Sequence, residues 1–352
     1  MKAAPGRLNG PLLGAIFVVG ASALWGTTGT VATFAPSVSP LAIGAVAMGV
    51  GGLLQALYAV QPIAGHWGSL RGRWLLVSLG AVAVAVYPLA FYSSMHLSGV
   101  ALGTVVSIGS APLASAVIER LAERKVLTRR WMLGALIGVA GAGLLSFAGD
   151  SAERPGALAE PWAVPGGIVL GLVAGVTYAL YSWAAHRLIS GGVSSRAAMG
   201  AVFGLGGVLL MPVLAATGRP LLESWGNFTV GAYMALVPMF AGYVLFGWGL
   251  ARVRASTATG LSLMETVVAA VLAVVVVGER LPVLGWVGVV MVLASLFVLT
   301  PGQPALPQPG AFLRDIHDSD GSGAKAFESL KEQQGRRRNR RPCPNAQPPH
   351  HQ

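Results

Sequence analysis

The sequence predicts an all-α integral membrane protein of ten transmembrane helices, arranged as two inverted five-helix repeats and followed by a disordered C-terminal tail. Three observations support this prediction. Charged residues make up 11% of the 352 residues and hydrophobic residues 54%, whereas a soluble domain carries about 25% charged residues. Ten apolar stretches, nine of them without a charged residue, are long enough to cross a bilayer. Lys and Arg lie almost entirely between alternate stretches, as expected of cytoplasmic loops.

The first span, 11–34, follows a short basic N-terminus over residues 1–10. Its beginning also resembles a signal peptide, because Ala21 and Ala23 are spaced as at a cleavage site. The apolar run continues to Phe34 without a charge, so it is too long for a signal core and favours a membrane span. The other spans are expected at 40–60, 74–95, 99–118, 131–149, 163–185, 197–217, 227–250, 256–277 and 282–300.

The positions of Lys and Arg test the number of spans. If the N-terminus is cytoplasmic and the tail is left out, thirteen Lys and Arg residues fall inside and only Arg154, Arg219 and Arg280 fall outside. A miscounted span would destroy this alternation, so we expect both termini in the cytoplasm. The composition, rich in Ala, Val, Gly and Arg, suggests a bacterium and hence a bacterial cell-membrane protein.

Weak internal similarity relates the two halves at an offset of about 154 residues. Ala101 aligns with Ala255, and Gly134 with Gly288. A half with five helices inserts upside down relative to its twin, and such inverted repeats are typical of secondary transporters. The expected organisation is a cytoplasmic N-terminus at 1–10, a first repeat at 11–149, an external linker at 150–162, a second repeat at 163–300 and a cytoplasmic tail at 301–352.

One carboxylate, Glu265, lies deep inside the ninth span. As a helix, 256–277 is about 33 Å long and places Glu265 about 13 Å from one end. A charge at that depth costs several kcal/mol, so such a residue usually faces a cavity or a partner. Glu265 lies near Ser262, one turn back on the same face, and could take up a proton from outside and release it inside, which would couple proton entry to substrate exit. Alternatively, its carboxylate could bind a substrate amine. The alternative is a structural hydrogen bond between helices.

Aromatic and hydroxyl residues in the first and sixth spans predict two facing walls of a central cavity. Trp25 and Thr28 lie in the first span and Tyr178 and Tyr181 in the sixth; an aromatic ring can line a pocket for an apolar or cationic group. Single Thr and Ser residues more often bond the backbone. The third and eighth spans contain weaker candidates, namely Tyr87, Tyr92, Tyr243, Pro88 and Pro238. The alternative is that the tyrosines belong to the membrane interface and that the prolines only kink the helices for packing.

Other polar residues receive structural interpretations. Glu119 and Glu123 are expected to form solvated ion pairs with Arg120 and Arg124 at the end of the fourth span. Scattered histidines indicate no metal site. Glycines four residues apart predict close helix packing and leave a homodimer open: Gly134 and Gly138, Gly171 and Gly175, Gly200 and Gly204.

The tail, 301–352, is polar and contains an arginine run at 336–341. This composition predicts a disordered tail. The arginine run favours some attraction to anionic lipid headgroups, and nucleic-acid binding is a weaker alternative. Cys343, His350 and His351 have no spacing that fixes a metal site, and a single cysteine forms no disulfide framework.

The stretch LSLMETVVAAVLAVVVVGERLPVLGWVGVVMVLASLFVL resembles the EamA domain of the drug/metabolite transporter superfamily, and ASALWGTTGT and APLASAVIERLAERKVLTRRWMLGALIGVAGAGLL agree with its first half. The resemblance covers about residues 12 to 300 and is closest to bacterial exporters of the threonine/homoserine kind. Thr266 stands where the family usually has proline, which puts a helix kink in doubt, and Arg124-Lys125-Val126 replaces Gly-Glu-Arg. The resemblance implies export of small metabolites driven by an ion gradient or by exchange.

The expected function is secondary active export of an amino acid or related amine by alternating access, with proton antiport left open. No glycine-rich phosphate loop is present, which argues against ATP as the energy source. A multidrug or other metabolite permease is an alternative. A membrane enzyme using Glu265 as acid or base, or a structural membrane protein, is another. The expected partners are a small-molecule substrate and membrane lipid, without nucleic acid, cofactor or metal.

Overall fold

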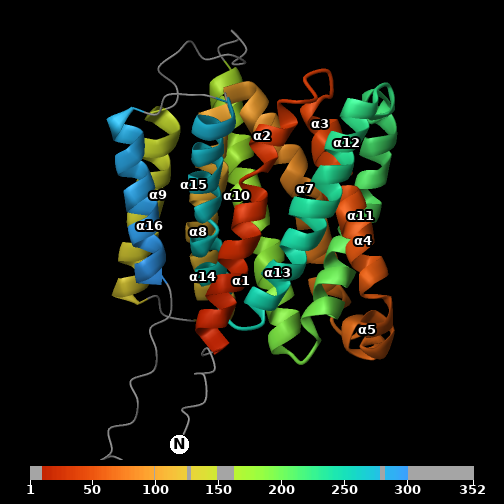
Figure 1. Cartoon of the computed structure of the whole chain (residues 1–352). Helices are drawn as coiled ribbons and strands as arrows, with labels where there is room; N and C mark the ends of the chain where they lie inside the picture. The colour runs from red at the N-terminus through yellow and green to blue at the C-terminus, as the bar shows by residue number, and fades with distance from the viewer. Residues whose placement is uncertain (1–9, 99, 125–127, 149–161, 278–281, 300–352) are drawn as a thin grey trace, which may run out of the picture. The chain divides into compact units, whose positions relative to one another are not determined.

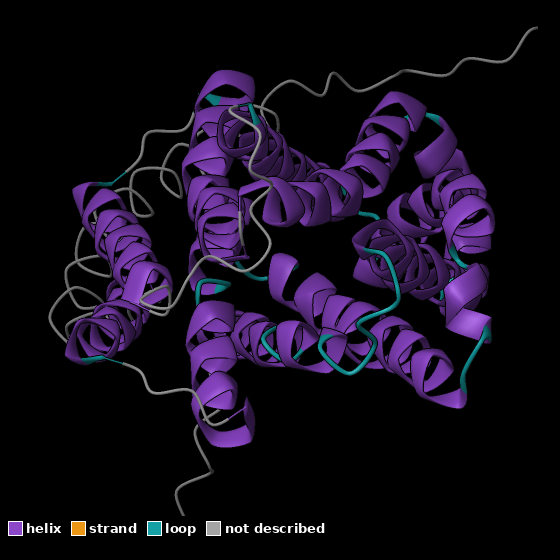
Figure 2. Ribbon diagram, turned by 90° about the horizontal axis from the view of Figure 1, so that it is seen from above, coloured by secondary structure: helices purple, strands orange, loops and turns teal. Residues whose placement is uncertain are grey.

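The computed structural model describes residues 10–98, 100–124, 128–148, 162–277 and 282–299. Within these ranges every regular element is helical (Figure 2). The elements are α1 (Gly10–Trp25), α2 (Thr28–Ala32), α3 (Pro40–Gly44), the π-helical η1 (Ala45–Val50), α4 (Gly51–Tyr58), α5 (Val60–Gly65), α6 (Trp67–Arg71), α7 (Trp74–Ser98), α8 (Val100–Glu123), α9 (Arg129–Ala148), α10 (Ala163–Ser190), α11 (Ser195–Thr217), the 3₁₀-helical η2 (Arg219–Leu222), α12 (Trp225–Met234), the π-helical η3 (Ala235–Ala241), α13 (Gly242–Leu250), α14 (Ala255–Leu261), α15 (Met264–Leu272), the π-helical η4 (Ala273–Val277) and α16 (Val283–Leu299).

These helices form the ten spans that the sequence predicts. Four spans are composite, namely α1–α2, α3–η1–α4, α12–η3–α13 and α14–α15–η4. In the described part of the chain, seven spans are long and apolar enough to cross a membrane by themselves, and α16 is a shorter apolar helix. α8 and α9 complete the set with 24 and 20 residues. The fourth and sixth spans run further than expected, to Glu123 and Ser190. The predicted tail lies outside the described residues.

Helices of the two halves pack against each other in reciprocal pairs. The first helix of each half packs on the third of the other, as α1 does on α13 and α10 on α7. The second helices pair as α4 with α11, the fourth as α8 with α14, and the fifth as α9 with α16; the last pair lies side by side in Figure 1. Two repeats related by a two-fold axis produce this reciprocity.

Glycines allow the close approach of paired helices, as their spacing predicts. A Cβ on Gly138 of α9 would lie 2.7 Å from the Ser295 Oγ of α16, and one on Gly134 would lie 3.0 Å from Leu299. Gly204 of α11 packs in the same way against Ala56 of α4. Small residues bring backbones together where lipid offers no hydrophobic driving force.

Large apolar side chains cover the outside of the described helices. Trp225, Val283 and Phe297 are about four-fifths exposed, at 79%, 81% and 80%. Exposed apolar surface of this extent suits a protein surrounded by lipid.

Candidate functional site

The ninth span is interrupted next to its carboxylate. Ser262 and Leu263 separate α14 from α15, so Glu265 lies in the first turn of α15. Two hydroxyls bond backbone carbonyls at the interruption: Ser262 Oγ donates to Thr259 O at 2.8 Å, and Thr266 Oγ1 donates to Leu263 O at 2.7 Å. The helix is therefore broken here although Thr266 replaces the proline, and broken membrane helices commonly surround binding sites.

The first span is interrupted at the same place in the bundle. Gly26 and Thr27 separate α1 from α2, so Trp25 ends one helix and Thr28 begins the next. Thr28 Oγ1 donates to Trp25 O at 2.7 Å. A Cβ on Gly26 would lie 2.8 Å from Glu265 O, so a glycine is what allows the two interruptions to touch.

A pocket of about 440 Å³, part of it open to solvent, lies beside the two interruptions. Among the described residues that line it, Glu265 is the one acidic side chain, and its carboxyl group makes no hydrogen bond to any described residue. The lining comprises Trp25, Thr28, Gly44, Ala47, Met48, Tyr87, Pro88, Phe91, Tyr92, Tyr178, Met239, Tyr243 and Glu265. The pocket thus combines one carboxylate with several aromatic rings.

The structure brings most of the residues singled out by sequence into this pocket. Trp25, Thr28, Tyr92 and Tyr178 line it together with Glu265, although they come from four different spans. Ser262 and Tyr181 do not line it. Ser262 is fully buried and bonded to the backbone. That any of these residues binds a solute remains a prediction.

Tyr181 supports the pocket wall from behind. Its hydroxyl lies 2.7 Å from the hydroxyl of Tyr243, which does line the pocket. The Tyr243 ring lies 4.7 Å from the Trp25 ring, and Trp25 Nε1 donates to Pro238 O at 2.9 Å. These contacts fix the aromatic rings in place before any solute arrives.

Tyr178 lines the pocket with a buried hydroxyl that is not hydrogen bonded within the described part of the chain. Its ring centroid lies 6.3 Å from that of Trp25 in an edge-on arrangement. Its hydroxyl is buried and has no hydrogen-bond partner among the described residues. Buried hydroxyls are usually bonded, so this group is available to a water or a bound solute.

Sequence reasoning missed part of the lining. Met48 and Met239 come from the π-helical turns η1 and η3, and Phe91 stacks on Tyr87 with ring centroids 5.6 Å apart. π-helical turns are frequent at functional sites. Pro238 was a signal for the turn that contains Met239, whereas the sequence around Met48 offers none.

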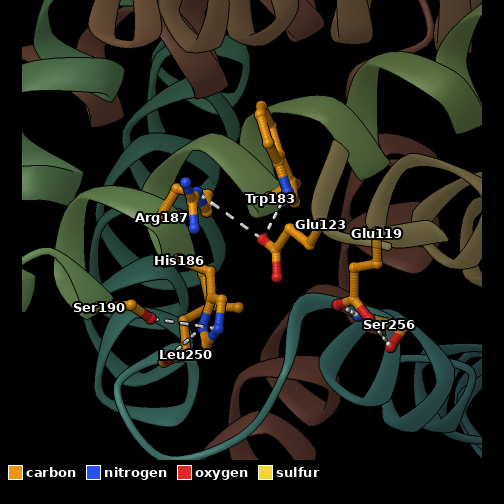
Figure 3. Close-up of polar contacts among 8 residues, drawn as sticks. All are labelled: Glu119, Glu123, Trp183, His186, Arg187, Ser190, Leu250 and Ser256. Atoms are coloured by element: carbon orange, nitrogen blue, oxygen red, sulfur yellow. Dashed lines mark hydrogen bonds and ion pairs between the residues drawn. The ribbon is translucent and has the colours of Figure 1, made fainter. Parts of the chain in front are cut away.

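The interpretation of Glu119 and Glu123 as solvated ion pairs is wrong. They lie four residues apart on the face of α8 that turns toward the bundle, and Glu119 is only 1% exposed. Figure 3 shows Glu119 bonded to Ser256 and Glu123 directed at Trp183. The residues that bond these two carboxylates, Ser256 and Trp183, come from other spans.

Within the part of the chain that the structure describes, no group of three or more His, Cys, Asp or Glu residues could hold a metal ion. Cys343, His350 and His351 lie outside the described residues. The absence of a metal site remains a prediction.

Ten membrane helices in two reciprocal halves, with a pocket beside two broken spans, define a multi-pass membrane protein with an architecture typical of transporters. The chain belongs to the EamA-like transporter family, which matches residues 12–147 and again 165–300. The resemblance to the EamA domain is therefore confirmed.

Known proteins extend this similarity along most of the chain. A Bacillus subtilis protein described as uncharacterized transporter YwfM is 32% identical over 289 residues, covering 81% of this chain and 93% of the relative. A probable terminal-alkyne amino-acid exporter of Streptantibioticus cattleyicolor is 24% identical over 292 residues, covering 79% and 93%. A crystal structure at 18% identity covers 82% of this chain and 96% of its own, with a TM-score of 0.63, which shows a common fold.

Proposed function

We propose that this transporter exports a small metabolite carrying an amine, such as an amino acid or a related amine, by secondary active transport with alternating access. The observation that supports this most is the pocket itself, in which Glu265 is surrounded by Trp25, Tyr92 and Tyr178. A carboxylate attracts an ammonium group, and aromatic faces attract cations as well. The similarity to an amino-acid exporter points to the same class of solute.

Glu265 also gives a simple basis for proton antiport. Its carboxylate has no hydrogen-bond partner among the described residues, so a proton and a substrate amine compete for the same oxygens. If protonation displaces the amine on one side of the membrane and deprotonation restores binding on the other, proton entry is coupled to export. A ligand drives such a cycle only through its different affinity for the two states.

Contacts between chain connections support a proposed direction of insertion. Arg196 Nη2 donates to Tyr58 O at 2.7 Å, and Arg130 Nε donates to Val298 O at 2.9 Å, so these connections lie at one end of the bundle. Asn227 Nδ2 bonds Pro220 O and Ser37 Oγ at the other end. The first end is rich in arginine, and we therefore assign it, with both termini, to the cytoplasm of a bacterial cell.

A multidrug permease and a membrane enzyme are the competing functions. Chemistry at Glu265 would need a second acid or base within reach, whereas the described lining offers no second carboxylate and no histidine, lysine or arginine beside its tyrosines. Membership of a transporter family supports transport over catalysis.

The test is transport by the full chain in proteoliposomes holding a mixed pool of amino acids and small amines under an imposed pH gradient. Glu265→Gln should abolish gradient-driven movement of the transported solutes. Glu223→Gln is the matched control, because Glu223 is an exposed partner of Arg219 far from the pocket. If Glu265→Gln transports normally, the coupling role is refuted. Movement only of amines unrelated to amino acids would favour the multidrug permease.

A further inference from the structure

A buried polar contact joins α8 to α14 at the arginine-rich end of the bundle. The carboxylate of Glu119 accepts hydrogen bonds from Ser256 N at 2.9 Å and from Ser256 Oγ at 2.8 Å (Figure 3). Glu119 is 1% exposed and Ser256 2% exposed. Both oxygens of the carboxylate are therefore bonded to one residue of the opposite half of the protein.

The contact continues one helical turn further along both helices. Thr259 Oγ1 donates to Ser115 Oγ at 3.1 Å, and both residues are fully buried. Ser115 and Glu119, which lie four residues apart on α8, thus contact Thr259 and Ser256, which lie three residues apart on α14. All four residues therefore lie at one interface between the two helices.

A second carboxylate joins α8 to α10 at the same end. Glu123 Oε1 accepts a hydrogen bond from Trp183 Nε1 at 2.9 Å and lies 3.8 Å from Arg187 Nε (Figure 3). α10 is in turn bonded to the end of α13, because His186 Nδ1 lies 2.8 Å from Leu250 O. Helices of both halves are thereby tied together at one membrane surface.

The bond between Glu119 and Ser256 has no side-chain counterpart at the repeat-related positions. The family matches give an offset of 153 residues between the halves and the internal similarity one of about 154. The positions equivalent to Glu119 are then Leu272 or Ala273, and those equivalent to Ser256 are Gly103 or Leu102. None of these four residues has a side chain that can hydrogen bond, so the two related places are held by different contacts.

We propose that Glu119 and Glu123 form a latch that closes the transporter at its arginine-rich end, and that release of the latch opens the pocket to that side. A carboxylate taken out of water must be bonded in the closed state, and Ser256 supplies those bonds. Water supplies them in the open state, so the closed and open states can be close in energy, as an alternating transporter requires. Ser256 and Glu265 belong to the same span, so movement of α14 away from α8 reaches the pocket directly.

The latch is tested by distance measurements that need no knowledge of the solute. Spin labels are placed at two exposed positions of this end, Leu121 of α8 and Arg254 before α14, in a full-length Cys343→Ser background in lipid nanodiscs. The parent should show mainly one short distance, and Glu119→Ala should raise the longer-distance population several-fold. Ser256→Ala should have a smaller effect, since its backbone N–H still donates.

Glu223→Ala at an exposed ion pair is the control for loss of a carboxylate, and it should leave the distances unchanged. An unaltered distance distribution in Glu119→Ala, or an equal change in the control, overturns the latch. If Glu119→Ala does not fold, the same distances are measured in Glu119→Gln and Ser256→Ala. A distribution unaltered from the parent in both variants then overturns the latch. Because this readout involves no transport, it can succeed or fail independently of the proposed amine export.

Discussion

The hydroxyl pair Tyr181–Tyr243 offers a quantitative test of how the pocket wall is held. The two oxygens lie 2.7 Å apart, and the residues are 0% and 3% exposed. Tyr181→Phe leaves the Tyr243 hydroxyl buried without this partner, which should destabilise the protein by about 1–3 kcal/mol. Replacing both tyrosines by phenylalanine removes both polar groups, so the double variant should be no less stable than the worse single variant.

The free energy of unfolding is measured by circular dichroism during titration with SDS in mixed micelles, for the parent, the two single variants and the double variant. Tyr58→Phe serves as control, since Tyr58 is 39% exposed, and it should change stability by less than about 0.5 kcal/mol. The reasoning is refuted if the two single effects add in the double variant to within about 0.3 kcal/mol, because additive effects mean that the hydroxyls do not interact.

Two further substitutions test the interruption of the first span. Gly26→Ala would place a Cβ 2.6 Å from Val268 Cβ, and this overpacking should destabilise the protein by about 1–3 kcal/mol and slow transport. Gly29→Ala is the control, because the position has open space around it. Equal stability of the two variants in the SDS titration would contradict the contact at Gly26. Trp25→Phe loses the 2.9 Å bond to Pro238 O and should destabilise by about 1–3 kcal/mol while raising the KM for export. An unchanged KM would argue against Trp25 as part of the binding wall.

The number of spans and the position of Glu265 inside one of them could be predicted from the sequence, because both depend on local information; the role of Glu265 stays a prediction. Apolar length sets the spans, and a single carboxylate inside one of them is conspicuous. The interruption beside Glu265 was harder to predict, since it depends on hydroxyls of Ser262 and Thr266 bonding nearby carbonyls and not on a proline.

The contacts of Glu119 and the place of Met48 in the pocket lining could not be predicted, because both depend on tertiary structure. Glu119 is adjacent to Arg120 in sequence, yet its partner, Ser256, is 137 residues away. Met48 reaches the pocket from a π-helical turn in an otherwise uniform apolar span. Neither contact leaves a periodic signal in the sequence.

The two acidic residues Glu119 and Glu265 show that depth in the membrane is an incomplete guide to function. Glu119 has both carboxylate oxygens bonded to Ser256, so no further ligand is needed to offset its burial. Glu265 borders a pocket and has no hydrogen-bond partner among the described residues, so only a proton, water or a solute can offset its charge. A carboxylate bonded within the protein can hold helices together, whereas one that borders a pocket without such a bond is accessible to a proton, a water or a solute. Glu265 lies on the broken ninth span, and Glu119 bonds to Ser256 of the same span. We therefore infer that this span links binding in the pocket to release of the latch.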